Sequence, residues 1–204
     1  MFVKERFPPV ALLTLDAAIA RLKDGHLRLP VIQQKAAQLQ KGYNGERKLD
    51  YHLQSLDHNF SILSDVTLSV LGRQFQSDSL IISSYAISIV EVKNLSGELT
   101  FNTRLNQLTQ QNGEVLFGRK YPITQVKNIA YLLQRWLEQM KINLLNIYYF
   151  VGLADQNAII HVNGDEEVIS KYVSYVEELP MKIVKTDLDL RKIKRENNRV
   201  KNQT

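Results

Sequence analysis

A chain of 204 residues with 44% hydrophobic side chains is long enough to form one domain with a substantial core and a small extension. The absence of cysteine excludes a disulfide framework, a thiol nucleophile and a thiolate metal site, and no stretch reaches the apolar length of a membrane span. The formal charge is +5, but residues 185–204 contain seven Lys or Arg against three Asp or Glu and so supply +4 of it. We therefore expect a cytoplasmic protein without a membrane partner, with a nearly neutral body and a basic C-terminal tail that is either solvated or in contact with a phosphate backbone.

Residues 1–42 form a predicted N-terminal helical extension. Apolar side chains recur at helical spacing over residues 12–22, and Pro30 predicts the start of a second helix that ends near Gly42. A third helix is expected to begin after Asn44, with leucines at the spacing of one helical face. Glu46 would then lie in the first turn of this third helix, where the helix dipole favours acids.

From residue 60 onward, short Ile- and Val-rich segments alternate with Gly and Ser, which is typical of an antiparallel meander. The predicted strands are 60–71, 75–83, 85–94, 98–102, 107–111 and 114–118, with a turn signal at Asn112-Gly113 before the last. Pro122 opens the clearest helix, and two further strands (146–153 and 158–162) and a helix (166–178) follow. This order predicts an α/β (α+β) fold, a mixed sheet flanked by helices.

The strand over residues 85–94 ends in Glu91-Val92-Lys93. Alternation along a strand places Ile87, Ile89, Glu91 and Lys93 on one face, so two opposite charges continue an apolar face. Such charges are costly to desolvate unless something uses them, and a metal ion with a phosphate would use both. The alternative is a solvent-facing salt pair at a strand end.

Asp78 shares a strand face with Leu80 and Ile82, a position where acids are rare. It lies thirteen residues before Glu91, which fits one strand, a tight turn and a neighbouring strand, so that the two carboxylates would lie side by side. Two such carboxylates repel each other unless a cation lies between them. Hard oxygen donors of this kind predict a Mg²⁺ site. The alternative is an edge-strand charge that discourages aggregation.

Gln125 lies in the first turn of the helix that begins at Pro122, beside its apolar stripe. There its amide could donate a hydrogen bond to a metal-bound water or to a phosphate. The alternative is an ordinary polar residue at a helix start.

Four segments carry a resemblance to a known family: Gly45-Glu46, Ser77–Ile82, Val90–Asn94 with Gly97, and Pro122–Gln125. In order and spacing they resemble the nuclease-related domain, NERD, of the PD-(D/E)xK nuclease superfamily. The resemblance covers roughly residues 43–140 and implies a restriction-endonuclease-like core. We therefore expect a NERD nuclease-like domain over 43–184, between the extension and the tail over 185–204. Two positions depart from the family, which often has His at the position of Ser79 and a Trp near Phe101.

The resemblance implies a role for each polar residue of these segments. The candidate catalytic residues are Glu46, Asp78, Glu91, Lys93 and Gln125. Asp78, Glu91 and the backbone carbonyl of Val92 would hold Mg²⁺ or Mn²⁺, and Lys93 would orient the attacking water or stabilise the developing charge. Glu46, the helical acid, would bind through water or hold a second ion.

These residues predict a divalent-metal-dependent nuclease that hydrolyses DNA phosphodiester bonds. Basic residues near the glutamine helix, Arg119, Lys120 and Lys127, could contact the DNA backbone. One alternative is a non-enzymatic nucleic-acid-binding or scaffolding module that keeps a nuclease-like fold, and another is a metal-dependent hydrolase of RNA or a different phosphodiester. The sequence leaves open a homodimer and an unidentified protein partner.

Overall fold

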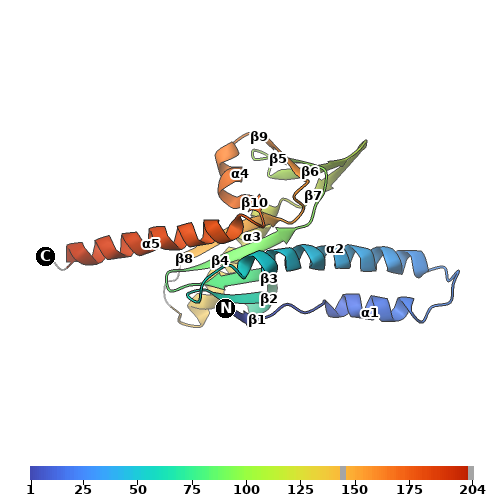
Figure 1. The fold of residues 1–204 in the computed structure, drawn as a ribbon, viewed down its shortest axis with the longest axis horizontal. Helices are drawn as coiled ribbons and strands as arrows, with labels where there is room; N and C mark the ends of the chain where they lie inside the picture. Colours follow the sequence, from blue (N-terminus) through green and yellow to red (C-terminus); the bar gives the residue numbers. More distant parts are fainter. Residues whose placement is uncertain (143–145, 202–204) are drawn as a thin grey trace.

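The computed structural model describes residues 1–142 and 146–201, which form two sheets and the helices around them (Figure 1). The larger sheet has the strand order β1-β2-β3-β4-β8-β10. Its strands are β1 (Phe2–Lys4), β2 (Ser61–Val70), β3 (Arg73–Ile82), β4 (Ala86–Lys93), β8 (Asn146–Leu153) and β10 (Val173–Tyr175). Strand β3 pairs antiparallel with β2 and β4, whereas β4 pairs parallel with β8, so the sheet is mixed as predicted.

The smaller sheet has the strand order β7-β6-β5-β9 and projects from one side of the larger one (Figure 1). Its strands are β5 (Glu98–Asn102), β6 (Gln107–Asn112), β7 (Val115–Arg119) and β9 (Ile159–Asn163). The predicted turn at Asn112-Gly113 joins β6 to β7, and Gly113 adopts a φ of 59° there. The predicted mixed sheet is the larger one, which also takes in β8 and β10, whereas β5, β6, β7 and β9 form this second sheet.

Helices cover both faces of the larger sheet. Helix α3 (Pro122–Gln139) packs against one face through a core that includes Val126, Ile89 and Val151. Helices α2 (Leu29–Leu53) and α5 (Leu179–Lys201) pack against the other face. Strand β4 lies between the two layers, and every residue from Ala86 to Val92 is buried. Its two terminal charges therefore lie at the edge of the core, as the alternation of the sequence predicted.

Two predicted helices of the N-terminal region are one in the structure. Helix α1 (Val10–Ile19) packs on α2, and α2 then continues without a break through Gly42. A helical glycine costs about 1 kcal/mol relative to alanine, but buried side chains on both sides of Gly42, Ala36 and Leu49, hold the helix together. The expectation that Glu46 lies in a first helical turn is wrong, because Glu46 lies deep inside α2. The extension boundary at residue 42 falls within this helix and stays a prediction.

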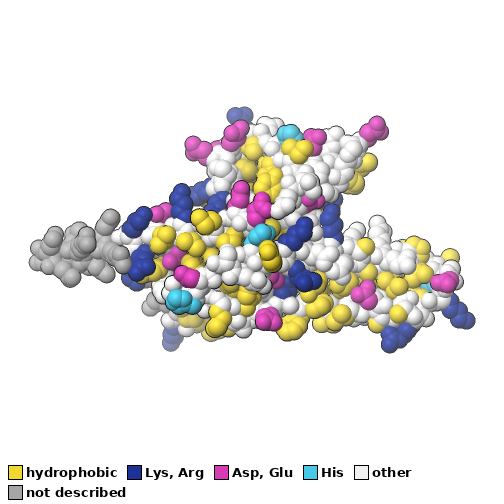
Figure 2. All heavy atoms as spheres, in the orientation of Figure 1, with side chains coloured by type: hydrophobic (Ala, Val, Ile, Leu, Met, Phe, Trp, Pro, Cys, Tyr) yellow, Lys and Arg dark blue, Asp and Glu magenta, His cyan; other side chains and the backbone are white. Residues whose placement is uncertain are grey.

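The C-terminal region also differs from the prediction. The helix expected over 166–178 is shorter, α4 (Glu166–Tyr172), because the next three residues pair with β8 as β10. The predicted tail begins inside α5, with residues 202–204 lying outside the described part of the chain. Figure 2 shows Lys and Arg side chains next to the residues of α5 that are drawn in grey. Among the described helices, none is both long and apolar enough to cross a membrane.

Candidate active site

Asp78 and Glu91 lie on neighbouring strands at the point where the ladder between them ends. The antiparallel pairing of β3 with β4 runs through Leu80↔Ile89 and ends at Ser79↔Val90, so its continuation would set Asp78 opposite Glu91. There the Asp78 side chain replaces a backbone acceptor, because its Oδ2 accepts a hydrogen bond from the Val92 N–H at 2.7 Å. The predicted side-by-side placement of the two acids is therefore present in the structure.

The backbone around Asp78 is irregular on its other side as well. The pairing of β2 with β3 is regular on either side of Asp65 and Asp78 but omits these two residues, and Asp65 has a φ of 54°. The carbonyl of Asp78 accepts instead from the guanidinium of Arg6 at 2.8 Å. Both the side chain and the carbonyl of Asp78 thus have specific partners outside the regular ladder.

Glu91 is bound by two of the predicted residues. Its Oε1 accepts from the Lys93 ammonium at 2.7 Å and from the side-chain amide of Gln125. Gln125 comes from the first turn of α3, and Lys93 follows Glu91 by two residues on the same face of β4. Glu91 is 4% exposed, so both contacts are made largely out of water. Gln125 was expected to face a water or a phosphate, and here its amide fixes the Glu91 carboxylate.

The pKa of Asp78 reflects its burial and the proximity of other acids. Burial, and then the charges of Glu91 and Glu46, raise the pKa of Asp78 to about 8. The Val92 N–H and the Lys93 ammonium offset only part of this effect. Without a cation the carboxyl of Asp78 is therefore mostly protonated at neutral pH, and binding of a cation would release this proton.

Glu46 reaches the site because α2 approaches the sheet closely at the preceding residue. A Cβ on Gly45 would lie 2.7 Å from the Cβ of Asn94 and 3.3 Å from that of Ala154, so only glycine fits between α2 and the strand ends. Burial raises the pKa of Glu46, and the opposite charge of Arg6 limits that rise. The Glu46 carboxylate accepts from Arg6 at 2.6 Å.

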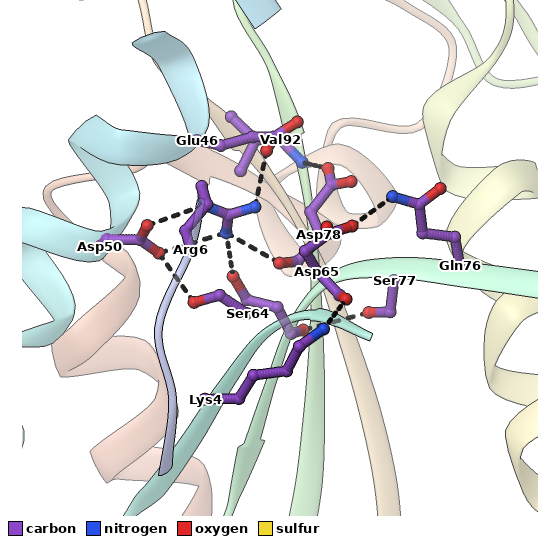
Figure 3. A network of polar contacts seen from close by, with 11 residues as sticks. Lys4, Arg6, Glu46, Asp50, Ser64, Asp65, Gln76, Ser77, Asp78 and Val92 are labelled. Atoms are coloured by element: carbon purple, nitrogen blue, oxygen red, sulfur yellow. Dashed lines mark hydrogen bonds and ion pairs between the residues drawn. The ribbon is translucent and has the colours of Figure 1, made fainter. Parts of the chain in front are cut away.

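Arg6 is the site residue that sequence reasoning missed. It follows β1, and its side chain is 3% exposed between α2 and β3 (Figure 3). It donates to both oxygens of Asp50, at 2.7 and 3.2 Å, and to the hydroxyl of Ser79 at 3.0 Å. Burial lowers the pKa of Arg6, but Asp50 and Glu46 outweigh this and raise it on balance. Its partners lie 40 to 73 residues away in the chain, so no local motif marks it.

The donor set of the site fits a hard divalent cation. Two carboxylates face each other, and the Val92 carbonyl lies on the Asp78 side of β4, because the N–H and C=O of one strand residue point to the same edge. Three or more His, Cys, Asp or Glu side chains grouped to hold a metal occur nowhere in the described residues. A cation held by Asp78 and Glu91 would therefore take any third protein donor from the backbone, where the Val92 carbonyl is available. The predicted basic residues Arg119, Lys120 and Lys127 are exposed near the start of α3.

A comparison with family models decides the relationship of the chain. The model described as the nuclease-related domain matches residues 41–154, more than half of the sequence. The chain belongs to the nuclease-related domain (NERD) family. Neither the curated proteins nor the solved structures contain a match to it.

The match places the site within the NERD segment. All five predicted catalytic residues fall inside it, and they come from α2, β3, β4 and α3. Arg6 lies outside it, on the N-terminal segment, from which its side chain reaches Glu46 of α2. The family shows that the protein is nuclease-related; the role of each of its residues stays a prediction.

Proposed function

We propose that this NERD protein is a divalent-metal-dependent nuclease that hydrolyses DNA phosphodiester bonds. The observation that carries the proposal is the pairing of Asp78 with Glu91 at the end of a buried strand, with Lys93 and Gln125 on one oxygen of Glu91. Two buried acids and a lysine at one strand end have no evident structural purpose, since apolar residues would pack there at lower cost.

Asp78, Glu91 and the Val92 carbonyl are the residues that would hold Mg²⁺ or Mn²⁺. Because Lys93 and Gln125 both bind Oε1 of Glu91, they orient the carboxylate, and Oε2 would remain available to an ion. An ion bound there would polarise the phosphoryl oxygen and lower the pKa of the attacking water. Asp78 would hold the ion as a carboxylate, so binding would require the loss of the proton that burial and the neighbouring acids favour there.

Lys93 carries the more exposed positive charge of the site. Its side chain is 22% exposed, whereas that of Glu91 is 6% exposed, so the ammonium lies at the mouth of the site and the carboxylate behind it. From this position Lys93 orients the attacking water or stabilises the negative charge that develops on the phosphate. The geometry fits hydrolysis better than binding alone, because a binding surface needs neither paired acids nor their precise orientation.

DNA is the proposed substrate because the family is nuclease-related and exposed basic residues come shortly before α3. Arg119 and Lys120 immediately precede the helix that carries Gln125, and both are exposed. Contacts from such residues reach the phosphates of either DNA or RNA and carry no sequence information. The preference for DNA is therefore tested directly against RNA.

The decisive experiment is plasmid cleavage with Mg²⁺ or Mn²⁺. Wild-type protein is compared with Asp78→Asn and Glu91→Gln, which keep the shape of the site, and with Glu114→Gln, which changes an exposed acid in the β6–β7 turn. Metal-dependent nicking that is lost in the first two variants and kept in the third supports the proposal. Binding of DNA without cleavage in the presence of either metal would favour the non-enzymatic binding module. Cleavage of RNA in preference to plasmid would make RNA the substrate.

A further inference from the structure

The buried guanidinium of Arg6 lies among acids that a nuclease site could use for metal. One of its nitrogens contacts Glu46, two contact Asp50, and one also bridges to the carbonyl of Asp78 and the hydroxyl of Ser79. Figure 3 shows it between α2 and the metal-facing strands. Arg6 therefore contacts the Glu46 carboxylate and the Asp78 backbone at once, whereas the Asp78 carboxylate accepts from the Val92 N–H.

One divalent ion would offset most of the negative charge that the acids around Arg6 carry. Glu46, Asp50, Asp78 and Glu91 carry four negative charges when ionised, and Arg6 and Lys93 return two positive charges by direct contact. The net formal charge of these six groups is −2, which one divalent ion would neutralise, and Asp65, whose charge also acts on Glu46, adds one further negative charge. A second ion would leave the buried cluster positive, which is costly in a medium of low dielectric constant.

We propose that Arg6 occupies the position of a second cation beside Glu46, so that the site takes one divalent ion per chain. The inference deepens the proposed function and rests on the metal site assigned there to Asp78, Glu91 and Val92. Glu46 then acts as the partner of Arg6 and not as a metal ligand. Arg6 is a positioning residue, because it holds Glu46 and the Asp78 backbone and touches no reacting atom.

Displacing Arg6 by an ion would be unfavourable for reasons of hydrogen bonding. The guanidinium has no conjugate base within reach of neutral pH, so it cannot leave the acids as a neutral group. Its departure would leave the Asp78 carbonyl and both oxygens of Asp50 without their charged donor. Breaking a buried ion pair from one side is strongly destabilising, because it leaves an uncompensated buried charge.

The test is the number of Mn²⁺ ions bound per chain, measured by electron paramagnetic resonance of free Mn²⁺ without DNA. We expect one ion for the wild type, one for Glu46→Gln and one for Arg6→Lys, which keeps the charge. Asp78→Asn should weaken the binding of this ion by at least about tenfold, a loss of about 1.4 kcal/mol in binding free energy. Arg6→Gln should admit a second, weaker ion, and the double variant Arg6→Gln/Glu46→Gln should lose that second ion again.

The possible results distinguish the role proposed for Arg6 from the nuclease function on which it rests. Two ions in the wild type, one of them lost in Glu46→Gln, would show that Glu46 is a metal ligand and overturn the role of Arg6 alone. No ion in the wild type would overturn the metal site and with it the proposed function. If Arg6→Gln does not fold, as circular dichroism would show, the comparison of the wild type with Glu46→Gln still decides the question, because Arg6 is intact in both.

Discussion

Two glycines of α2 should respond differently to substitution by alanine, because only one of them lies in tight contact with the ends of the sheet strands. Gly42 and Gly45 are both helical, but a Cβ on Gly42 would meet nothing within 4 Å, whereas one on Gly45 would lie 2.7 Å from the Cβ of Asn94. The Asn94 Cβ is fixed to the backbone of the strand end, and its amide is held by the carbonyl of Lys41 at 2.7 Å. The clash can therefore be relieved only by moving α2 or the strand end.

The magnitudes of the two substitutions follow from this difference. Gly42→Ala should raise the free energy of unfolding by about 1 kcal/mol, the helix preference of alanine over glycine. Gly45→Ala gains the same ~1 kcal/mol and loses ~1–3 kcal/mol to overpacking, so it should be neutral or destabilising. A difference of ~2 kcal/mol would separate the Tm values of the two variants by about 4–8 °C in a chain of this size.

The assay is thermal and urea unfolding of both variants beside the wild type, followed by circular dichroism. Gly42→Ala is the matched control, since it lies on the same helix and changes the same atoms. Equal stabilisation by both substitutions would refute the close approach at Gly45. It would also remove the reason given for the position of Glu46, because that residue is carried to the site by this contact.

Two further predictions concern the site itself. Lys93→Met should lower the rate of plasmid cleavage by about 10²–10³-fold, the usual effect of removing one group that stabilises transition-state charge. The same variant should bind Mn²⁺ nearly as tightly as the wild type. A variant that cleaves like the wild type would disprove the role of Lys93. The second prediction is a pH dependence. The folded-state pKa of Asp78 is raised to about 8 from an ordinary 3.8, so the folded protein holds a proton that the unfolded chain has lost. In chelator, the stability of the wild type relative to Asp78→Asn should therefore fall as pH rises from about 4 to 8, by at most about 1.4 kcal/mol per pH unit, and urea unfolding at pH 5 and pH 8 measures this. Equal slopes for the two proteins would contradict the raised pKa.

The strands and helix α3 were predictable because local patterns determine them. Alternating Ile and Val residues and the Asn112-Gly113 turn place β2 to β7 within a few residues of their observed bounds. The thirteen-residue separation of Asp78 and Glu91 was enough to predict their juxtaposition, because antiparallel strands joined by a short turn have little freedom of register.

Other features depended on contacts between distant parts of the chain. Gly42 predicted a helix end, but packing of α2 on α1 and on the sheet overrides that local signal. Strands β1 and β10 have three residues each and exist only because they pair with β2 and β8. Arg6 could not be found for the same reason: each of its acidic partners is at least 40 residues away, and its short charged segment reads as an exposed surface.

The continuity of α2 has a mechanical consequence. The helix has 25 residues, a length of about 37 Å, and it projects with α1 as an arm well beyond the body (Figure 1). An unbroken helix behaves as a stiff lever, and the tight contact at Gly45 is its fulcrum. Glu46 lies one residue past that contact, so a tilt of the arm about Gly45 moves the far end of α2 most and the acid bound by Arg6 least.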